Sequence, residues 1–324
     1  MPEEAEASQA RLRDQPVSEE TLTLLDRNPL IQLDNLRLND VQLAAEELSL
    51  FKKLGGGSVI DVTPRGLGRD VNSVRKISDL TELNIVVATG WYISSSHPAE
   101  VVQGSKDELA QVMVRELTEG IEDTGVRAGV IKCAVGGITG DPTDPVEKRK
   151  IHPDEEKVLR AASIAQRSTG SCITLHPCVF KRDFDFYIDV LEEEGADITK
   201  FYMAHVDNLF PSLDLNYCKS ILETGASISF DTFGHDTDIG YFGEPSTVSD
   251  KDRMKVLSEL CKVGYDRQIL VGQDVATKRR LVRYGGKGYG HLLKHIVPKL
   301  REGGLPEHVV RNILIENPKR LLAH

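Results

Sequence analysis

Short apolar runs alternate with amphipathic helical segments along most of this chain, and this pattern constrains the fold more than any other feature. The runs lie at 58-62, 84-88, 127-132, 171-176, 200-204, 226-230 and 268-272. Helical segments lie near 41-54, 70-80, 106-122, 154-168, 183-194, 213-223, 250-263, 289-302 and 306-322. Repeated βα units of this kind are typical of a parallel sheet covered by helices. We therefore predict a (β/α) barrel with seven recognisable strands, one short of closure.

The N-terminal region does not supply an obvious eighth strand. Residues 1-26 are polar and charged, so we expect a flexible tail there. The segment 29-38 is the one strand candidate, although Asp34, Asn35 and Arg37 interrupt it. If it does not pair, the strands at 58-62 and 268-272 each keep an open edge. No linker rich in Pro, Gly or Ser divides the remainder, so we expect residues 27-324 to form a single domain.

Composition narrows the class of partner. The net charge is −10, with 40 Lys and Arg against 50 Asp and Glu, which argues against a nucleic acid or an anionic membrane surface. No apolar run is long enough to cross a membrane, and the N-terminus lacks the apolar core of an export signal. The five cysteines are scattered and form no C-x-x-C pair, which suits a reducing compartment. We expect a cytoplasmic protein that acts on a small molecule.

Three glycine-rich stretches bear on nucleotide binding. The glycines at 55-57 precede a strand, which suits a helix end better than a phosphate loop. The stretch 66-71 follows a strand, but Val71 replaces the third glycine of a dinucleotide fingerprint. The stretch 284-290 follows a basic cluster, which either attracts an anionic substrate or forms a solvated face. The basic residues of this cluster are Lys278, Arg279, Arg280 and Arg283.

Four residues able to take part in a metal centre stand at the ends of separate apolar runs. They are Lys132 after AGVI, His176 after CITL, His205 after FYMA and Asp274 after ILVGQ. One histidine at such a place is often a core residue, but two in successive βα units beside a buried lysine favour a metal site. Carbamylation would turn Lys132 into a carboxylate able to bridge two ions. Asp274 could then ligate one ion and accept the proton of a bound water.

Seven ordered segments resemble the phosphotriesterase family of the amidohydrolase superfamily. They are VIDVTPRGLGRDV (59-71), VVATGWY (86-92), GIEDTGVRAGVIK (120-132), ITLHP (173-177), AHVDN (204-208), ILVGQD (269-274) and the C-terminal GYGHLLKHIVPKL…ILIENPKRLL. The resemblance implies a TIM (β/α)8 barrel with two metal ions, usually zinc, whose bridging hydroxide attacks a phosphoryl or carbonyl centre. By position, Lys132 resembles the carbamylated bridging lysine, and His176 and His205 the ligands of the more exposed ion. Asp274 resembles the ligand and proton acceptor at the buried ion.

Further positions in the resemblance bear on the substrate. Tyr92 matches a tyrosine that lactonase-like members place against the hydroxide, which favours carboxyl esters or lactones over phosphotriesters. The segment 230-236 resembles a loop of the lactonase branch, with Thr232 where arginine is frequent. Asp207 and Asp231 occupy places that support proton transfer or hold ligands in the family, or else they cap helices and loops. Arg279 and Arg280 are candidate substrate contacts, and family members are often homodimers.

The departures from the family concern the metal site. No His-x-His occurs in the sequence, although the family's first strand ends in one, and Cys133 stands where some relatives carry a glutamate. We expect that the start of the first βα unit was lost by truncation or by an incorrect start. A site without two ligands should bind metal weakly and hydrolyse little. The alternatives are a pseudoenzyme with a partial metal site and a binding or regulatory role, or an unrelated nucleotide-binding α/β protein.

Overall fold

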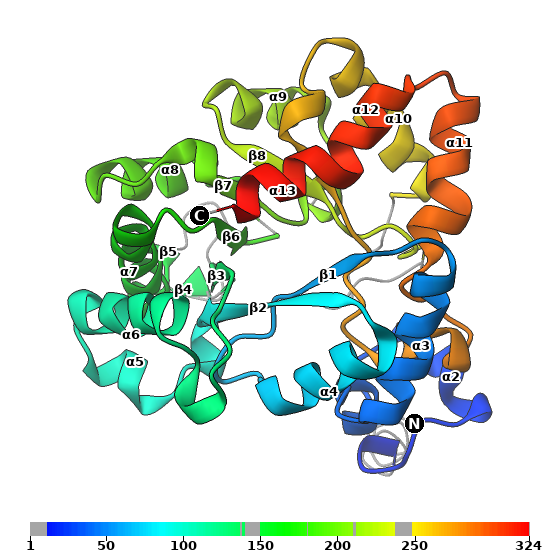
Figure 1. The fold of residues 1–324 in the computed structure, drawn as a ribbon, viewed down its shortest axis with the longest axis horizontal. Helices are drawn as coiled ribbons and strands as arrows, with labels where there is room; N and C mark the ends of the chain where they lie inside the picture. Colours follow the sequence, from blue (N-terminus) through cyan, green and yellow to red (C-terminus); the bar gives the residue numbers. More distant parts are fainter. Residues whose placement is uncertain are drawn as a thin grey trace, which may run out of the picture.

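The fold is an incomplete (β/α)8 barrel whose strands curl into one sheet with helices on its outer side (Figure 1). The computed structural model describes residues 12–136, 138–139, 150–179, 181–209, 212–236 and 248–323. Seven parallel strands follow the order β1-β2-β3-β6-β7-β8-β9. They are β1 Ser58–Asp61, β2 Asn84–Gly90, β3 Val130–Ala134, β6 Ile173–His176, β7 Phe201–Met203, β8 Ser227–Phe230 and β9 Ile269–Val271. All seven predicted strands are confirmed, and a short antiparallel pair, β4 Ile138–Thr139 with β5 Lys150–Ile151, lies outside the prediction.

Several helices begin where the sequence supplies a capping side chain. Asp40 accepts a hydrogen bond from Leu43 N at the start of α3, and Ser105 and Glu108 form a capping box at α6. The helices of the βα units are α3 Val41–Lys53, α4 Val71–Thr81, α5 Ala99–Gln103, α6 Lys106–Thr118, α7 Pro153–Thr169, α8 Phe184–Glu193, α9 Leu215–Glu223 and α10 Asp250–Lys262. The C-terminal part comprises η11 Leu292–Ile296, α11 Val297–Glu302, α12 Glu307–Arg311, η12 Asn312–Glu316 and α13 Asn317–Leu322. These bounds lie close to the predicted helical segments.

The core lies mainly between the sheet and the helices around it. Every residue of β3 and β8 is buried, including Lys132 in β3 and Ser227 and Ser229 in β8. Ile131, Ile173 and Phe201 come from three adjacent strands and belong to one cluster of buried apolar side chains. This packing fixes the carboxyl ends of the strands, where the candidate site lies.

The segment 29-38, the one candidate for an eighth strand, does not form a strand, and the sheet stays open as expected for that case. Leu33–Leu36 form the short helix η2 instead, and β1 and β9 are the end strands of the described sheet. The polar residues that interrupt the apolar pattern hold the segment in place. Asp34 pairs with Lys278 at 2.7 Å, and Asn35 accepts a hydrogen bond from Arg279 N at 2.9 Å. The segment is thereby fastened to η9 Lys278–Arg280 by polar contacts.

Part of the expected flexible tail is folded. Residues Glu19–Thr21 and Leu22–Arg27 form η1 and α2, and the Leu25 side chain is buried within the described chain. Asp26 pairs with Arg279 at 2.8 Å. Residues 19–26 are therefore helical although their composition is polar. Asp26, one of the polar residues there, contacts Arg279 in the segment after β9.

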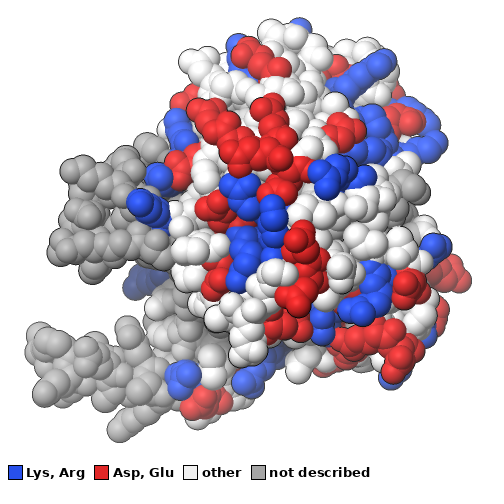
Figure 2. All heavy atoms as spheres, turned by 90° about the vertical axis from the view of Figure 1, so that its left-hand side faces the viewer, with Lys and Arg blue, Asp and Glu red and all other residues white. Residues whose placement is uncertain are grey.

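Charges of both signs are mixed on the face formed around α6, α7 and α8. Figure 2 shows Lys and Arg interleaved with Asp and Glu there. Arg160 of α7, for example, pairs with Glu156 at 2.9 Å and with Glu193 at 2.8 Å. Such a face carries no extended field of one sign that would attract a polyanion. Among the described helices, none is both long and apolar enough to cross a membrane.

Candidate active site

The four predicted strand-end residues lie toward the carboxyl ends of four strands of one sheet. Lys132 lies within β3, His176 ends β6, and His205 and Asp274 follow β7 and β9. His205 and Asp274 have φ angles of 56° and 41°, in the left-handed region that residues other than glycine seldom adopt. Such backbone strain concentrates at functional sites, because only there does function require it. Among the described residues other than glycine, Glu82 and Glu122 also have positive φ, but only His205 and Asp274 of this group lie at the carboxyl ends of the strands.

Three of the predicted side chains gather closely. The rings of His176 and His205 lie edge to face with centroids 4.8 Å apart, and the Tyr92 hydroxyl lies 3.3 Å from each ring nitrogen of His176. Gly90 makes the turn before Tyr92 possible. Its φ is 102°, and a Cβ atom there would lie 2.1 Å from the carbonyl oxygen of Lys132. The glycine therefore allows β2 to approach β3 closely just before Tyr92.

His205 is held by Asp231 at the end of β8. One carboxylate oxygen, Oδ1, lies 2.6 Å from His205 Nδ1 and accepts the His205 backbone N–H at 3.0 Å. Burial alone would lower the pKa of His205, but the charge and hydrogen bond of Asp231 outweigh it and raise that pKa. In the neutral ring this contact keeps the proton on Nδ1 and leaves Nε2 free to bind an electrophile.

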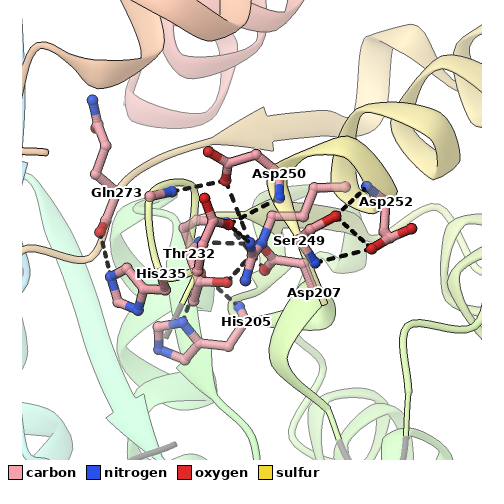
Figure 3. Close-up of polar contacts among 12 residues, drawn as sticks. His205, Asp207, Thr232, His235, Ser249, Asp250, Asp252 and Gln273 are labelled. Atoms are coloured by element: carbon pink, nitrogen blue, oxygen red, sulfur yellow. Dashed lines mark hydrogen bonds and ion pairs between the residues drawn. The ribbon is translucent and has the colours of Figure 1, made fainter. Parts of the chain in front are cut away.

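Asp207 in turn holds the backbone that carries Asp231. Its Oδ1 accepts from Asp231 N at 3.2 Å, and its Oδ2 accepts from Thr232 N and Oγ1 at 3.1 and 2.8 Å (Figure 3). Arg253 of α10 adds a fourth donor, because its Nε lies 2.9 Å from Oδ2 and both side chains are fully buried. Thr232 thus has a defined role where arginine was expected from the resemblance.

Arg253 and its carboxylate partners Asp207, Asp236 and Asp250 form a network, the Arg253 network, that was not predicted from the sequence. Arg253 also contacts Asp236 and Asp250 at 3.4 Å, and Asp250 lies 2.7 Å from His291 Nε2. A signal for it did exist in the sequence. Arg253, Leu257 and Leu260 are spaced for one helix face, and the two leucines are buried, so an arginine on this face had to meet a buried partner.

Lys132 and Asp274 lie in an environment that favours their neutral forms. Burial lowers the pKa of Lys132 against the opposing charges of Asp231 and Asp274, and burial raises the pKa of Asp274. A neutral amine is the form that reacts with carbon dioxide to give a carbamate. Burial also raises the pKa of Cys133 to about 12, so its thiol stays protonated and cannot substitute for a bridging carboxylate.

The donor set fits one ion better than two. His176 and His205 provide two imidazoles, the donors that zinc and similar ions prefer. Within the described ranges, however, no three His, Cys, Asp or Glu side chains form a metal-binding group, and the sequence contains no His-x-His. Lys132 as a carbamate would supply the additional ligand for an ion at the two histidines. Asp274 would be left with few partners for a second ion.

The two arginines predicted to contact substrate differ in their surroundings. Arg279 donates to Asp26 at 2.9 Å and to the carbonyl of Tyr284 at 2.9 Å, and so it joins the N-terminal helices to the loop after β9. Arg280 follows Asp274 in the chain after β9, and its positive charge opposes the rise that burial causes in the pKa of Asp274. The role of either arginine in substrate binding stays a prediction.

A parallel sheet with polar groups gathered at the carboxyl ends of its strands is the arrangement found in (β/α)-barrel enzymes. The model of the phosphotriesterase family matches residues 15–322, and the chain belongs to this family of hydrolases, whose members generally depend on a binuclear metal centre. This assignment confirms the resemblance seen in the sequence. It also removes the alternative of an unrelated nucleotide-binding protein.

Relatives with names and structures extend the comparison. The chain is 33% identical to the N-acetyltaurine hydrolase of Xenopus tropicalis over 98% of this chain and 87% of that protein. It is 34% identical to that of Dictyostelium discoideum, over 90% and 75%. A resiniferatoxin-binding protein from Rhodobacter sphaeroides has a TM-score of 0.88 at 33% identity, covering 98% and 85%. A lactonase variant from Deinococcus radiodurans has a TM-score of 0.73 at 29% identity, covering 87% and 86%.

Proposed function

We propose that this chain is a metal-dependent hydrolase that cleaves an acyl bond, in an amide, a carboxyl ester or a lactone. The observation that carries the proposal is the convergence of Tyr92, His176 and His205, with His205 oriented by Asp231. His176, His205 and a carbamylated Lys132 would hold a divalent ion such as zinc. When bound, that ion would polarise the carbonyl and make a water molecule acidic enough to attack it near neutral pH.

The protein groups have separate roles in this proposal. Asp231 keeps the proton of His205 on Nδ1, which leaves Nε2 as the binding atom. Asp274 would accept a proton from the attacking water, a task suited to a carboxylate whose pKa is raised by burial. The Tyr92 hydroxyl, 3.3 Å from the His176 nitrogens, is placed to donate a hydrogen bond to the substrate oxygen.

The choice of an acyl bond over a phosphotriester rests on two supports. Tyr92 occupies the position where the resemblance places tyrosine in lactonase-like members and tryptophan in organophosphate hydrolases. Relatives covered over more than two thirds of their length are named N-acetyltaurine hydrolases, whose substrate is an amide, and a structural neighbour is a lactonase. Both observations favour a substrate that is attacked at a carbonyl carbon over one that is attacked at phosphorus.

A second candidate function is ligand binding without turnover. The sequence lacks the His-x-His of the family, and a structural neighbour with a TM-score of 0.88 is named a resiniferatoxin-binding protein. A partial metal site that binds an acyl compound but does not activate water would act in this way. This second candidate predicts that the chain binds the same acyl compounds as the proposed hydrolase but releases no hydrolysis products.

The two candidates separate in one experiment. The purified chain is loaded with zinc, manganese or cobalt, its bound metal is quantified, and N-acetyltaurine, phenyl acetate, a γ-lactone and paraoxon are offered. We expect hydrolysis of at least one acyl substrate in preference to paraoxon, and a loss of about 100-fold or more in His205→Ala, since a metal ligand is removed. Asp252→Asn, which changes only a helix cap, is the matched control. Equal activity in His205→Ala would refute the proposal, and binding without products would favour the second candidate.

A further inference from the structure

The loop after β2 contains a histidine, His97, whose ring turns back onto the residue that supplies the proposed substrate contact. Its Nε2 lies 2.7 Å from the backbone carbonyl oxygen of Tyr92. A carbonyl can only accept a hydrogen bond, so Nε2 carries the ring proton and donates it. The other ring nitrogen, Nδ1, is buried and has no hydrogen-bond partner within the described chain. The hydrogen bond of this ring is therefore directed at Tyr92.

The surroundings of His97 keep the ring in its neutral form. Burial lowers the pKa of His97 below its ordinary value of 6.5, and the contact with Tyr92 and the charges of Glu155 and Asp154 raise it less. A charged ring would also need an acceptor at Nδ1, which the described chain does not supply. The neutral ring with its proton on Nε2 is thus a steady donor near neutral pH.

The residues on either side of Tyr92 are anchored to neighbouring elements. Trp91 N donates to the carbonyl oxygen of Lys132 in β3 at 3.1 Å. Ser94 N donates to the carboxylate of Glu155 in α7 at 2.7 Å, and this glutamate is fully buried. The histidine contact holds the peptide group between these two anchors. It is therefore the contact that acts on the backbone of Tyr92 itself.

The Tyr92 side chain extends from this backbone to the candidate active site. Its hydroxyl lies 3.3 Å from each ring nitrogen of His176, and the two ring centroids are 5.0 Å apart. A group that donates to a reacting substrate must be held within about 0.5 Å of its productive position. Because the hydroxyl stands at the far end of the ring, a small change in backbone direction displaces it by a larger distance. The orientation of the Tyr92 peptide therefore matters for the hydroxyl.

We propose that His97 is a positioning residue for Tyr92, which it holds through the backbone carbonyl so that the hydroxyl meets the substrate oxygen. This inference rests on the proposed function, in which Tyr92 donates that hydrogen bond, and adds the residue that keeps the donor in place. His97 acts only through Tyr92. Its contribution to turnover should therefore disappear when the Tyr92 hydroxyl is removed.

Three variants separate the hydrogen bond of His97 from its bulk. His97→Leu removes the donor, His97→Asn supplies an amide too short to reach the Tyr92 carbonyl, and His97→Gln supplies an amide nitrogen at the place of Nε2. The first two should lower kcat about 10-fold for the acyl substrate that the metal-loaded chain hydrolyses fastest, with KM little changed, because the hydroxyl acts on charge that develops in the transition state. His97→Gln should restore most of this loss.

A double-mutant cycle tests whether the effect passes through Tyr92. In the Tyr92→Phe background, His97→Leu and His97→Asn should lower kcat no further, whereas a general role in folding of the loop would give the same loss in both backgrounds. His308→Leu is the matched control, because it makes the same change at an exposed residue of α12. We expect it to leave kcat unchanged.

A second measurement needs neither metal nor turnover. Tyrosines labelled with carbon-13 in the ring give NMR signals, and the Tyr92 signal is identified by its absence in Tyr92→Phe. The ring current of His176, whose centroid lies 5.0 Å from that of Tyr92, makes this signal sensitive to the orientation of the tyrosine. We expect the signal to move or broaden in His97→Leu and His97→Asn and to keep its position in His97→Gln and His308→Leu.

The outcomes distinguish this inference from the proposed function. A loss of kcat that is equally large in the Tyr92→Phe background, or that His97→Gln does not restore, overturns the inference while the proposed hydrolase stands. If the unmodified metal-loaded chain hydrolyses no acyl substrate, the proposed hydrolase fails and the NMR signal decides the role of His97. A signal that moves in His97→Leu and returns in His97→Gln then supports the inference. A signal that stays in place in both His97→Leu and His97→Asn overturns it.

Discussion

Two regions of the sheet, the β7–β8 side and the open side between the end strands β1 and β9, support their candidate functional residues very differently. At the ends of β7 and β8, His205 is held by Asp231, and the backbone of Asp231 by Asp207, which is paired with the fully buried Arg253. At the open side, between β1 and β9, half-exposed ion pairs such as Lys278–Asp34 fasten the N-terminal segment. The first side is built from desolvated contacts that fix geometry, and the second from contacts with partial access to water.

This difference matches the chemistry expected of each side. The side around β6–β8 carries the two histidines, whose ring orientation must be set before an ion binds. The open side contributes Asp274 and lacks the His-x-His of the family. Geometry is therefore best supported where the proposed metal ligands lie, and the comparison can be tested by removing one contact from each side.

Removing the buried charge should have the largest effect on stability. Arg253→Met leaves the fully buried Asp207 without its ionic partner, and we expect the free energy of unfolding to fall by about 3–5 kcal/mol. Urea denaturation measures the change. The matched control is Arg160→Met on α7, whose partly exposed ion pairs should contribute about 1 kcal/mol or less. A loss for Arg253→Met no larger than that of the control would show that the network does not support the β7–β8 side.

The strands could be predicted from the sequence, because short runs rich in apolar residues alternate with amphipathic helical segments along the chain. His176 and His205 were found by the same logic, since a polar residue directly after such a run lies at the carboxyl end of the sheet. The folded N-terminal segment was not found, because Asp26 and Asp34 look like solvent-exposed residues until their partners, more than 200 residues away, are known. Long-range pairing of this kind leaves no local pattern.

Acidification tests the outer part of the Arg253 network. Burial by itself would raise the pKa of Asp250, but hydrogen bonds from His291 and Gly234 N, with nearby positive charge, hold it well below its ordinary value of 3.8. A carboxylate with a lowered folded-state pKa stabilises the fold above its unfolded pKa, and this contribution is lost as the pH falls through the folded value. Asp250→Asn should therefore destabilise by about 1–3 kcal/mol at pH 7.

The same variant predicts how stability depends on pH. The difference in unfolding free energy between Asp250→Asn and the unmodified chain should shrink as the pH falls below about 4, because the Asp250 carboxyl then binds a proton in the unfolded chain before it does so in the folded one. Thermal or urea unfolding between pH 7 and pH 3 provides the measurement, and Asp252→Asn, an exposed cap on the same helix, provides the control. A difference that stays constant over this range would mean that the Asp250 charge contributes nothing to the network.

The smallest effect is expected at the open side. Lys278→Met breaks the 2.7 Å pair with Asp34, whose side chains are 13% and 29% exposed, and we expect a loss of about 1 kcal/mol or less. A double-mutant cycle with Asp34→Asn isolates the pair, because Asp34 also accepts a hydrogen bond from Val17 N that the cycle subtracts. A coupling energy as large as the loss measured for Arg253→Met would erase the contrast between the two sides. A small one would show that the N-terminal segment is held by the sum of many weak contacts, with Asp26–Arg279 and the buried Leu25 among them.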